Sequence, residues 1–107
     1  MPALRKVLIV NKGHHFYDDA VKFGDLIFLT EGKINVFAIN NLKAEIEQAL
    51  DEHAAEEDYL LLSGHIIPNG IAIHHLLKKY GRVNQLVWIG NQNQYKVITM
   101  YDRPTGK

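Results

Sequence analysis

Three unbroken apolar runs, separated by helix-like segments, constrain the fold of this 107-residue chain more than any other feature. The runs are Val7–Val10, Leu26–Leu29 and Tyr59–Leu62. A continuous run, rather than an alternating one, is typical of a strand that is covered on both faces in a parallel sheet. Strands of this kind that alternate with helices predict an α/β fold, and right-handed crossovers leave it only a few topologies.

The first two helices are predicted from apolar faces at helical spacing. A short helix is expected before Gly24, which is placed for a left-handed C-terminal cap. The second helix is expected to begin at an N-cap, either Asn40 or Asn41. Residues 34–37, which precede it, are either a short strand or an ordered loop. The apolar faces comprise Phe16, Ala20 and Phe23 in the first helix and Leu42, Ile46, Ala49 and Leu50 in the second. The acidic residues Asp51, Glu52, Glu56, Glu57 and Asp58 are expected to cover the solvated end of the second helix.

A third helix and a hairpin complete the predicted fold. The helix is expected to hold Pro68 in its first turn and to end at Gly81. Its apolar face comprises Ala72, Ile73, Leu76, Leu77 and Tyr80. Residues 83–89 and 95–101 predict two strands that a short polar loop joins into a hairpin. We therefore expect a Rossmann-like three-layer sandwich with a mostly parallel sheet in the order 2-1-3-4-5 and an antiparallel C-terminal edge strand.

Length and charge limit the organisation and the partners. The chain is expected to form a single α/β domain over residues 1–107, with 102–107 as a frayed tail. Its 12 basic and 12 acidic residues leave no net charge, which disfavours nucleic acid and favours a homodimer or another protein partner. The absence of cysteine excludes disulfides, thiol catalysis and thiolate metal sites. No segment reads as a signal peptide or a membrane span, so we expect no membrane partner and a cytoplasmic location.

Two glycine-containing loops form the candidate ligand site. Residues Lys12–His15 follow the first strand and Ser63–His65 follow the third, so both loops are expected at the switch point where the strand order reverses. A helix N-terminus beside such a loop attracts anions, which predicts a small nucleotide- or phosphate-like ligand. The candidate ligand-binding residues are Lys12, Gly13, His14, Thr30, Ser63, Gly64, His65, Gly90 and Asn91. Since no G-x-G-x-x-G or Walker pattern is present, glycines that only make turns remain the alternative.

Catalysis is a second use of the same loops, and the sequence leaves it open. The candidate catalytic residues are His14, His15, Ser63 and His65. Imidazole exchanges protons near neutral pH, and Ser63 with a histidine and Asp18 or Asp19 can be drawn as a triad. However, the chain has neither a G-x-S-x-G elbow nor H-E-x-x-H, so no metal site is expected and the cofactor stays unknown. In the alternative interpretation, Ser63 caps a turn and the two aspartates favour a helix start.

Aromatic and basic residues near the C-terminus suggest further contacts. Trp88 and Tyr95 flank the hairpin and are suited to a homodimer through this edge. Alternatively, Trp88 packs under the third helix and Tyr95 pairs across the hairpin. The basic residues Lys78, Lys79 and Arg82 either contact a phosphate or complement the C-terminus of the third helix.

Three segments carry a resemblance to known proteins, namely Phe23–Gly32, Asp58–Gly64 and Tyr80–Asn84. Through them the chain resembles small uncharacterised α/β proteins often encoded by bacteriophages. The resemblance implies an accessory protein acting in an infected bacterial cell, and it carries over no catalytic residue. Three hypotheses follow. The protein binds a small anionic ligand or a host protein, it is a small phosphate- or ester-processing enzyme, or it is an assembly component that acts through a sheet edge.

Overall fold

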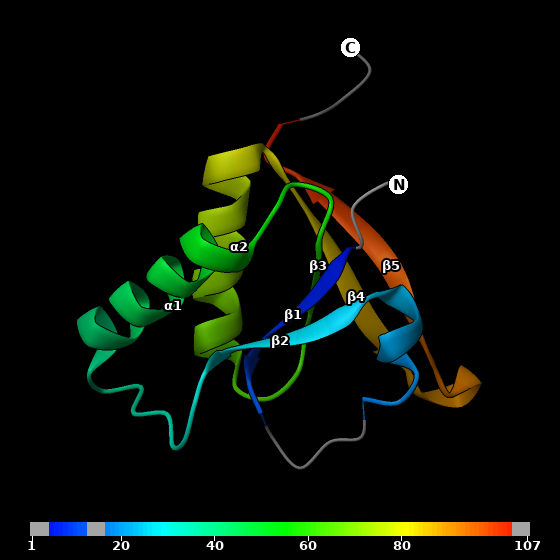
Figure 1. Cartoon of the computed structure of the whole chain (residues 1–107), viewed down its shortest axis with the longest axis horizontal. Coiled ribbons are helices and arrows are strands. Elements are labelled where there is room, and N and C mark those ends of the chain that lie inside the picture. Colours follow the sequence, from blue (N-terminus) through cyan, green and yellow to red (C-terminus); the bar gives the residue numbers. More distant parts are fainter. Residues whose placement is uncertain (1–4, 13–16, 104–107) are drawn as a thin grey trace.

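Five strands form one sheet in the order β2-β1-β3-β4-β5, which is the order expected from the sequence. The computed structural model describes residues 5–12 and 17–103 (Figure 1). The strands are β1 (Lys6–Asn11), β2 (Asp25–Thr30), β3 (Tyr59–Leu61), β4 (Arg82–Ile89) and β5 (Gln94–Tyr101). The first four run parallel, and β5 pairs antiparallel with β4 as predicted. The carboxyl ends of β1 and β3, which are neighbours, therefore lie at the same edge of the sheet.

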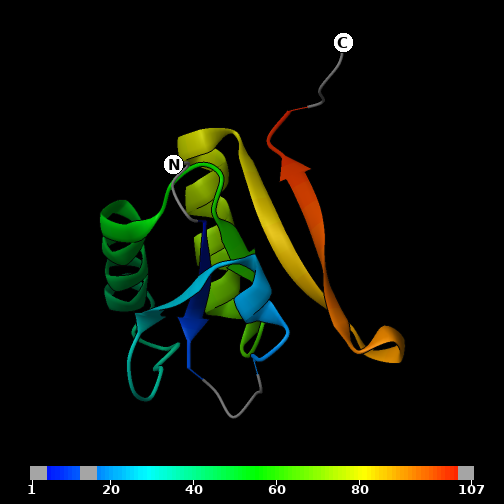
Figure 2. The same cartoon turned by 45° about the vertical axis from the view of Figure 1, so that its right-hand side comes forward.

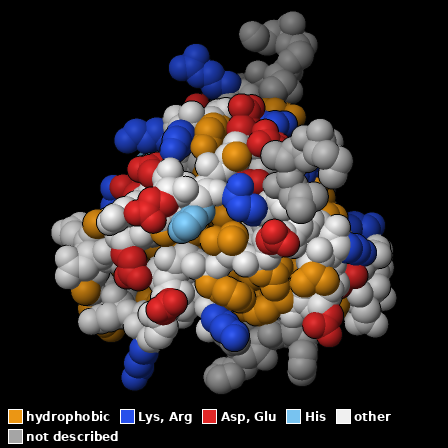
Figure 3. Space-filling view, in the orientation of Figure 1, with side chains coloured by type: hydrophobic (Ala, Val, Ile, Leu, Met, Phe, Trp, Pro, Cys, Tyr) orange, Lys and Arg blue, Asp and Glu red, His pale blue; other side chains and the backbone are white. Residues whose placement is uncertain are grey.

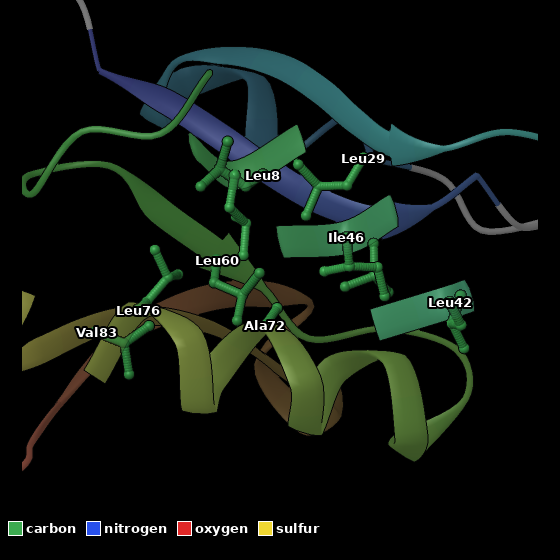
Figure 4. Packing of buried hydrophobic residues seen from close by; sticks show 10 residues of the cluster. Leu8, Leu29, Leu42, Ile46, Leu60, Ala72, Leu76 and Val83 are labelled. Atoms are coloured by element: carbon green, nitrogen blue, oxygen red, sulfur yellow. The ribbon is translucent and has the colours of Figure 1, made fainter. Parts of the chain in front are cut away.

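Both α-helices pack on the same face of the sheet. They are α1 (Ile39–His53) and α2 (Ile66–Tyr80), and their buried side chains meet those of the strands in one core (Figure 4). That core contains Leu8, Leu29, Leu42, Ile46, Leu60, Ala72, Leu76 and Val83. Burial of these apolar side chains stabilises the fold by about 25 cal/mol for each Å² removed from water. In the described ranges no helix is long and apolar enough to cross a membrane.

On the opposite face the described residues form one short helical element, the 3-10 helix η1 (Ala20–Phe23), so the expected three-layer sandwich is not confirmed. A second core on this face combines aliphatic side chains with the rings of Tyr17, Tyr59 and Tyr95. The short helix predicted before Gly24 is present as this 3-10 helix of four residues, while Phe16 lies outside the described residues. The turn ends at once because the backbone at Gly24 passes directly against that of Arg5.

Gly24 does not form the left-handed cap that the sequence predicts. Its φ is 153° and its ψ is −176°, a conformation that side chains with a Cβ rarely adopt. A Cβ at this position would clash with the carbonyl group of Arg5, whose carbon atom would lie 2.7 Å away. Gly24 thus permits a close approach of two chain segments and leads directly into β2.

The start of α1 differs from the prediction, because neither Asn40 nor Asn41 is its N-cap. The cap is Ala38, which offers no side-chain hydrogen bond. Instead, Asn35 shapes the preceding turn, because its Oδ1 accepts from the N–H of Phe37 at 3.0 Å and its carbonyl accepts from Ala38 at 3.2 Å. Residues 34–37 are therefore a loop with a turn and not a strand.

The boundaries of α2 agree with the sequence analysis. Pro68 is buried in the first turn, and Gly81 ends the helix in the left-handed conformation with φ 77°. The N–H of Asp102 donates to the carbonyl of Gly81 at 2.9 Å. Asp102, the first residue of the predicted tail, is thus bonded to the end of α2, while residues 104–107 lie outside the described part of the chain.

Asp58 is buried, although the sequence analysis places it among solvated acidic residues. Its carboxylate accepts from the backbone N–H groups of Lys6 at 2.9 Å and Ala55 at 2.8 Å. The ammonium of Lys6 lies 3.0 Å from the same carboxylate. Buried carboxylates need such partners because an unpaired charge is costly to bury. Asp58 therefore connects the start of β1 to the segment that enters β3.

Candidate functional site

The candidate site lies at the carboxyl edge of β1, β2 and β3, where hydrogen bonds order the connecting loops. The hydroxyl of Thr30 donates to the carbonyl of Val10 at 2.7 Å, which joins the ends of β1 and β2. The amide nitrogen of Asn11 donates to the carbonyl of Gly32 at 3.0 Å. These contacts hold the end of β1 against the loop after β2.

The loop between β3 and α2 is ordered by Asn69. Its Nδ2 donates to the carbonyls of Ser63 and His65, both at 2.7 Å. Gly64 turns the chain between them with φ 77°, a left-handed conformation that favours glycine. One buried amide on α2 therefore holds the whole Ser63–His65 loop against the helix.

Three polar atoms at this edge are buried and have no hydrogen-bond partner among the described residues. They are Oδ1 of Asn11, Oγ of Ser63 and Oδ1 of Asn69. Asn69 itself is only 7% exposed. Each buried unpaired polar group costs about 1–3 kcal/mol, so a native structure that keeps one calls for an explanation. All three belong to segments at the switch point between β1 and β3, where open α/β sheets bind ligands.

Lys12 brings a positive charge to the same edge. It is exposed, and its ammonium lies 5.9 Å from the centre of the Phe28 ring. No carboxylate pairs with Lys12 within the described ranges. Hydrophobic side chains gather over β2 and η1 (Figure 3), and Phe28 packs there against Tyr17 at an edge-to-face distance of 5.9 Å. The charge of Lys12 is thus available to an anionic group.

The start of α2 offers fewer backbone donors than the sequence suggests. The ring Nδ1 of His65 accepts from the N–H of Ile67 at 3.1 Å, so His65 is the N-cap of the helix. Pro68 has no N–H to offer. The helix dipole still favours a negative charge nearby, but most of the binding contacts must come from side chains.

The other predicted ligand residues do not all meet here. Gly13, His14 and His15 lie outside the described residues. Gly90 and Asn91 are exposed in η2 (Gly90–Gln92), at the tip of the β4–β5 hairpin. Figures 1 and 2 show this tip projecting away from the loop between β3 and α2.

The described residues do not form the triad that the sequence permits. Asp19 accepts from the N–H of Tyr95 and contacts Lys22, while Nδ1 of His65 is used by the helix cap. The Ser63 hydroxyl has no hydrogen-bond partner in the part of the chain that the structure describes. No group of three or more potential metal ligands occurs among residues 5–12 and 17–103. Catalytic roles for these residues stay predictions.

A small cavity of about 160 Å³ opens beside the end of β2. It is lined by Thr30, Glu31, Lys33, Ile34, Asn35, Ala38, Asn41, Leu42 and Glu45. Of these, only Thr30 is among the ligand-binding residues predicted from the sequence. The polar residues around the predicted start of α1 were the available signal, since a helix start faces the carboxyl edge of the sheet in this topology.

A network of charged side chains links α1 to α2, which the sequence analysis missed. Nε2 of His75 lies 2.8 Å from Asp51, and the ammonium of Lys79 lies 3.0 Å from the same carboxylate. These hydrogen bonds, that of His75 first, lower the pKa of Asp51 below its usual 3.8. A hydrogen bond from Lys43 likewise lowers the pKa of Glu47. Asp51 and His75 are 24 positions apart, so no local spacing reveals the pair.

The basic cluster near the end of α2 is partly neutralised. Lys79 contacts Asp51, and Nε of Arg82 lies 3.4 Å from a carboxylate oxygen of Glu56. The hairpin aromatics agree with only one half of the alternative arrangement, the pairing of Tyr95 across the hairpin. Tyr95 is buried and packs edge to face on Trp88, with ring centres 5.0 Å apart. Trp88 is 46% exposed and so is not packed under α2.

Comparison with known proteins gives one match. A family model described as phage Pam3 gp32-like protein matches residues 6–101. Neither the curated proteins nor the solved structures contain a match. The matched span covers the whole sheet and both helices, including the polar groups at the carboxyl edge.

Proposed function

Since this chain belongs to the family of phage Pam3 gp32-like proteins, we propose that it is a phage accessory protein that binds a small phosphorylated ligand in the host cytoplasm. The ligand class is one that combines hydroxyl groups with an anionic group, such as a nucleotide or a sugar phosphate. Its binding surface is the carboxyl edge of β1 and β3.

The single observation that supports this proposal is the set of unpaired polar atoms at that edge. Oδ1 of Asn11 and Oδ1 of Asn69 are acceptors, and the Ser63 hydroxyl can both donate and accept. Acceptors require a ligand with donors, which sugar hydroxyls supply. Because the hydrogen bonds of the loops already fix both asparagines, the acceptors are held in place before a ligand arrives.

The charge of Lys12 supports the anionic part of the ligand. Lys12 directly follows β1, and the aromatic ring of Phe28 is its only described contact. A phosphate bound by Lys12 also gains from the positive end of α2. Since His65 and Pro68 remove donors from the first turn, we expect Lys12 and Ser63 to contribute more to binding than the helix backbone.

The test is a thermal-shift series with nucleotides and sugar phosphates on the intact chain. A ligand that binds only the folded state raises the free energy of unfolding by RT ln(1 + [L]/Kd). We expect one phosphorylated class to raise Tm in the wild type, and we expect Ser63→Ala and Lys12→Gln to reduce that shift. Arg103→Gln is the control for charge, because Arg103 is exposed and follows the end of β5, which lies beside the start of β4 at the opposite edge of the sheet.

Ser63→Ala tests the site without breaking a described contact, because the hydroxyl it removes has no hydrogen-bond partner in residues 5–12 and 17–103. The unliganded variant should be as stable as the wild type or slightly more stable. The proposal would be contradicted if no phosphorylated compound raised the Tm of the wild type, or if the rise in Tm were equally large in all variants. Hydrolysis of a bound ester, lost in Ser63→Ala, would instead support the enzyme alternative.

A further inference from the structure

The outer edge of β5 is a free strand edge with an apolar surface. In the sheet β5 pairs only with β4, and Figure 2 shows it standing away from both helices. Val97, Ile98 and Tyr101 are each between 44% and 49% exposed. Lys96 is the only charged residue of the strand. Natural proteins protect long edge strands from uncontrolled pairing, so an edge as apolar as this one is expected to be covered.

The backbone groups that point to this edge can be identified. The N–H of Asp102 donates to Gly81, in line with β4, so even-numbered residues of β5 direct their N–H groups inward. Odd-numbered residues direct theirs outward, and that of Tyr95 is taken by the carboxylate of Asp19. The outward N–H groups of Val97, Thr99 and Tyr101 bind no group in the described ranges and remain for a partner. Asp19 thus limits the pairing surface to residues 96–102.

We propose that two copies of this chain pair antiparallel through residues 96–102, with Thr99 on the twofold axis. The segment reads Lys-Val-Ile-Thr-Met-Tyr-Asp and is complementary to its own reverse. The resulting opposed pairs are Lys96 with Asp102, Val97 with Tyr101, Ile98 with Met100, and Thr99 with Thr99. Opposite charges, aromatic with β-branched residues, and paired threonines are all favourable neighbours across antiparallel strands.

The charges of Lys96 and Asp102 favour a second copy of this chain as the partner at this edge. No ion pair within the described part of the chain involves Lys96 or Asp102, and both residues are exposed. In the proposed dimer each lysine faces an aspartate of the other copy, which gives two symmetric ion pairs. The net charge of zero means that no overall repulsion opposes the association of two copies.

The backbone hydrogen bonds favour the same register, independently of the charges. With Thr99 at the centre, Val97 pairs with Tyr101 and all three free N–H groups of each copy find carbonyl partners. A register centred on Ile98 would place Tyr101 opposite Tyr95, whose N–H already binds Asp19. That register would also place Lys96 opposite Met100. The proposed dimer therefore joins two sheets into one of ten strands, and it does not depend on the proposed ligand.

Charge reversal tests the dimer. The molar mass of the intact chain is measured by light scattering during size-exclusion chromatography over a range of concentrations. We expect the wild type to have twice the chain mass of 12.2 kDa. In Lys96→Asp and in Asp102→Lys, side chains of like charge face each other across the dimer, so each single variant should be a monomer. The double variant restores pairs of opposite charge and should be a dimer again. Lys33→Asp is the control for a change in net charge.

Two further measurements show whether a variant is still folded and whether the edge of β5 is paired. Circular dichroism confirms that each variant is folded, which is expected because both side chains are exposed. Amide hydrogen exchange should show slow exchange at Val97, Thr99 and Tyr101 in the wild type and fast exchange in the single variants. A wild type that is monomeric at all concentrations would overturn the proposal, as would a dimer that neither single variant weakens.

Discussion

The carboxylate of Asp19 accepts a hydrogen bond of 2.8 Å from the backbone N–H of Tyr95, although 76 positions separate the two residues. The same carboxylate lies 3.0 Å from the ammonium of Lys22. Both contacts, that of Tyr95 first, lower the pKa of Asp19 below its usual 3.8. Asp19 therefore ties the hairpin to the segment before η1 and closes one end of the free edge of β5.

Replacing Asp19 with Asn should weaken this contact. A carboxyl group whose pKa is lower in the folded state stabilises the fold above its unfolded pKa and loses that effect as the pH falls through its folded pKa. The stability of Asp19→Asn should therefore depend less on pH below about pH 4 than that of the wild type. The Tyr95 amide should also exchange faster with deuterium. Asp18→Asn is the matched control, and equal exchange at Tyr95 in all three proteins would contradict this role.

Gly24→Ala should be severely destabilising. The added Cβ would clash with the carbonyl of Arg5, and the φ of 153° disfavours any side chain. We expect a loss of about 3 kcal/mol or more in the free energy of unfolding, measured with urea. Gly32→Ala is the control, because Gly32 also has a positive φ but has open space around it, and it should cost only about 1 kcal/mol. Similar losses in both variants would show that the close approach at Gly24 is unimportant.

Asp58→Ala should leave two backbone N–H groups without their acceptor. Lys6 and Ala55 donate these groups, and the Lys6 ammonium loses its partner as well. We expect a cost of about 2–3 kcal/mol in chemical denaturation. Glu57→Ala alters an adjacent exposed acid and should change stability by less than about 0.5 kcal/mol. If the two substitutions had the same effect, the buried carboxylate would not be a structural anchor.

Asp51→Asn should reduce the dependence of stability on pH at both extremes. The pKa of Asp51 is lowered by His75 and Lys79, so its contribution is lost as the pH falls below about 4. The pKa of Lys79 is raised by Asp51, so that contribution is lost as the pH rises above about 10.5. Thermal melts across the pH range measure the loss of stability at low pH and at high pH. Glu45→Gln serves as the comparison, and identical pH profiles for the two variants would argue against the α1–α2 network.

His65→Ala should shorten or loosen the start of α2. The ring Nδ1 is the only side-chain cap of this helix, and losing an N-cap costs about 0.5–2 kcal/mol. His65→Asn should retain most of the stability because asparagine is a good N-cap. Urea denaturation measures the difference, and a catalytic role without a structural one would leave both variants as stable as the wild type.

The candidate site could be predicted only in part. Strand ends and glycines located Ser63 and Gly64 at the carboxyl edge, because β3 and its loop are local features of the sequence. The importance of Asn69 could not be predicted, since an asparagine inside a helix gives no sign that its amide will bind the preceding loop. The same holds for His65, whose capping role depends on the exact start of α2.

The strand order followed from the general rules for parallel α/β sheets. Local patterns in the sequence alone determined the strands, the ends of α2 and the C-terminal hairpin. Unbroken apolar runs and Gly81 define these features without reference to distant residues. Only the tertiary structure decided that both helices cover one face, that Asp58 is buried and paired with Lys6, and that Asp19 accepts a hydrogen bond from the N–H of Tyr95. Each of these depends on groups that are far apart in the chain, and their energies arise only when folding excludes water and brings them together.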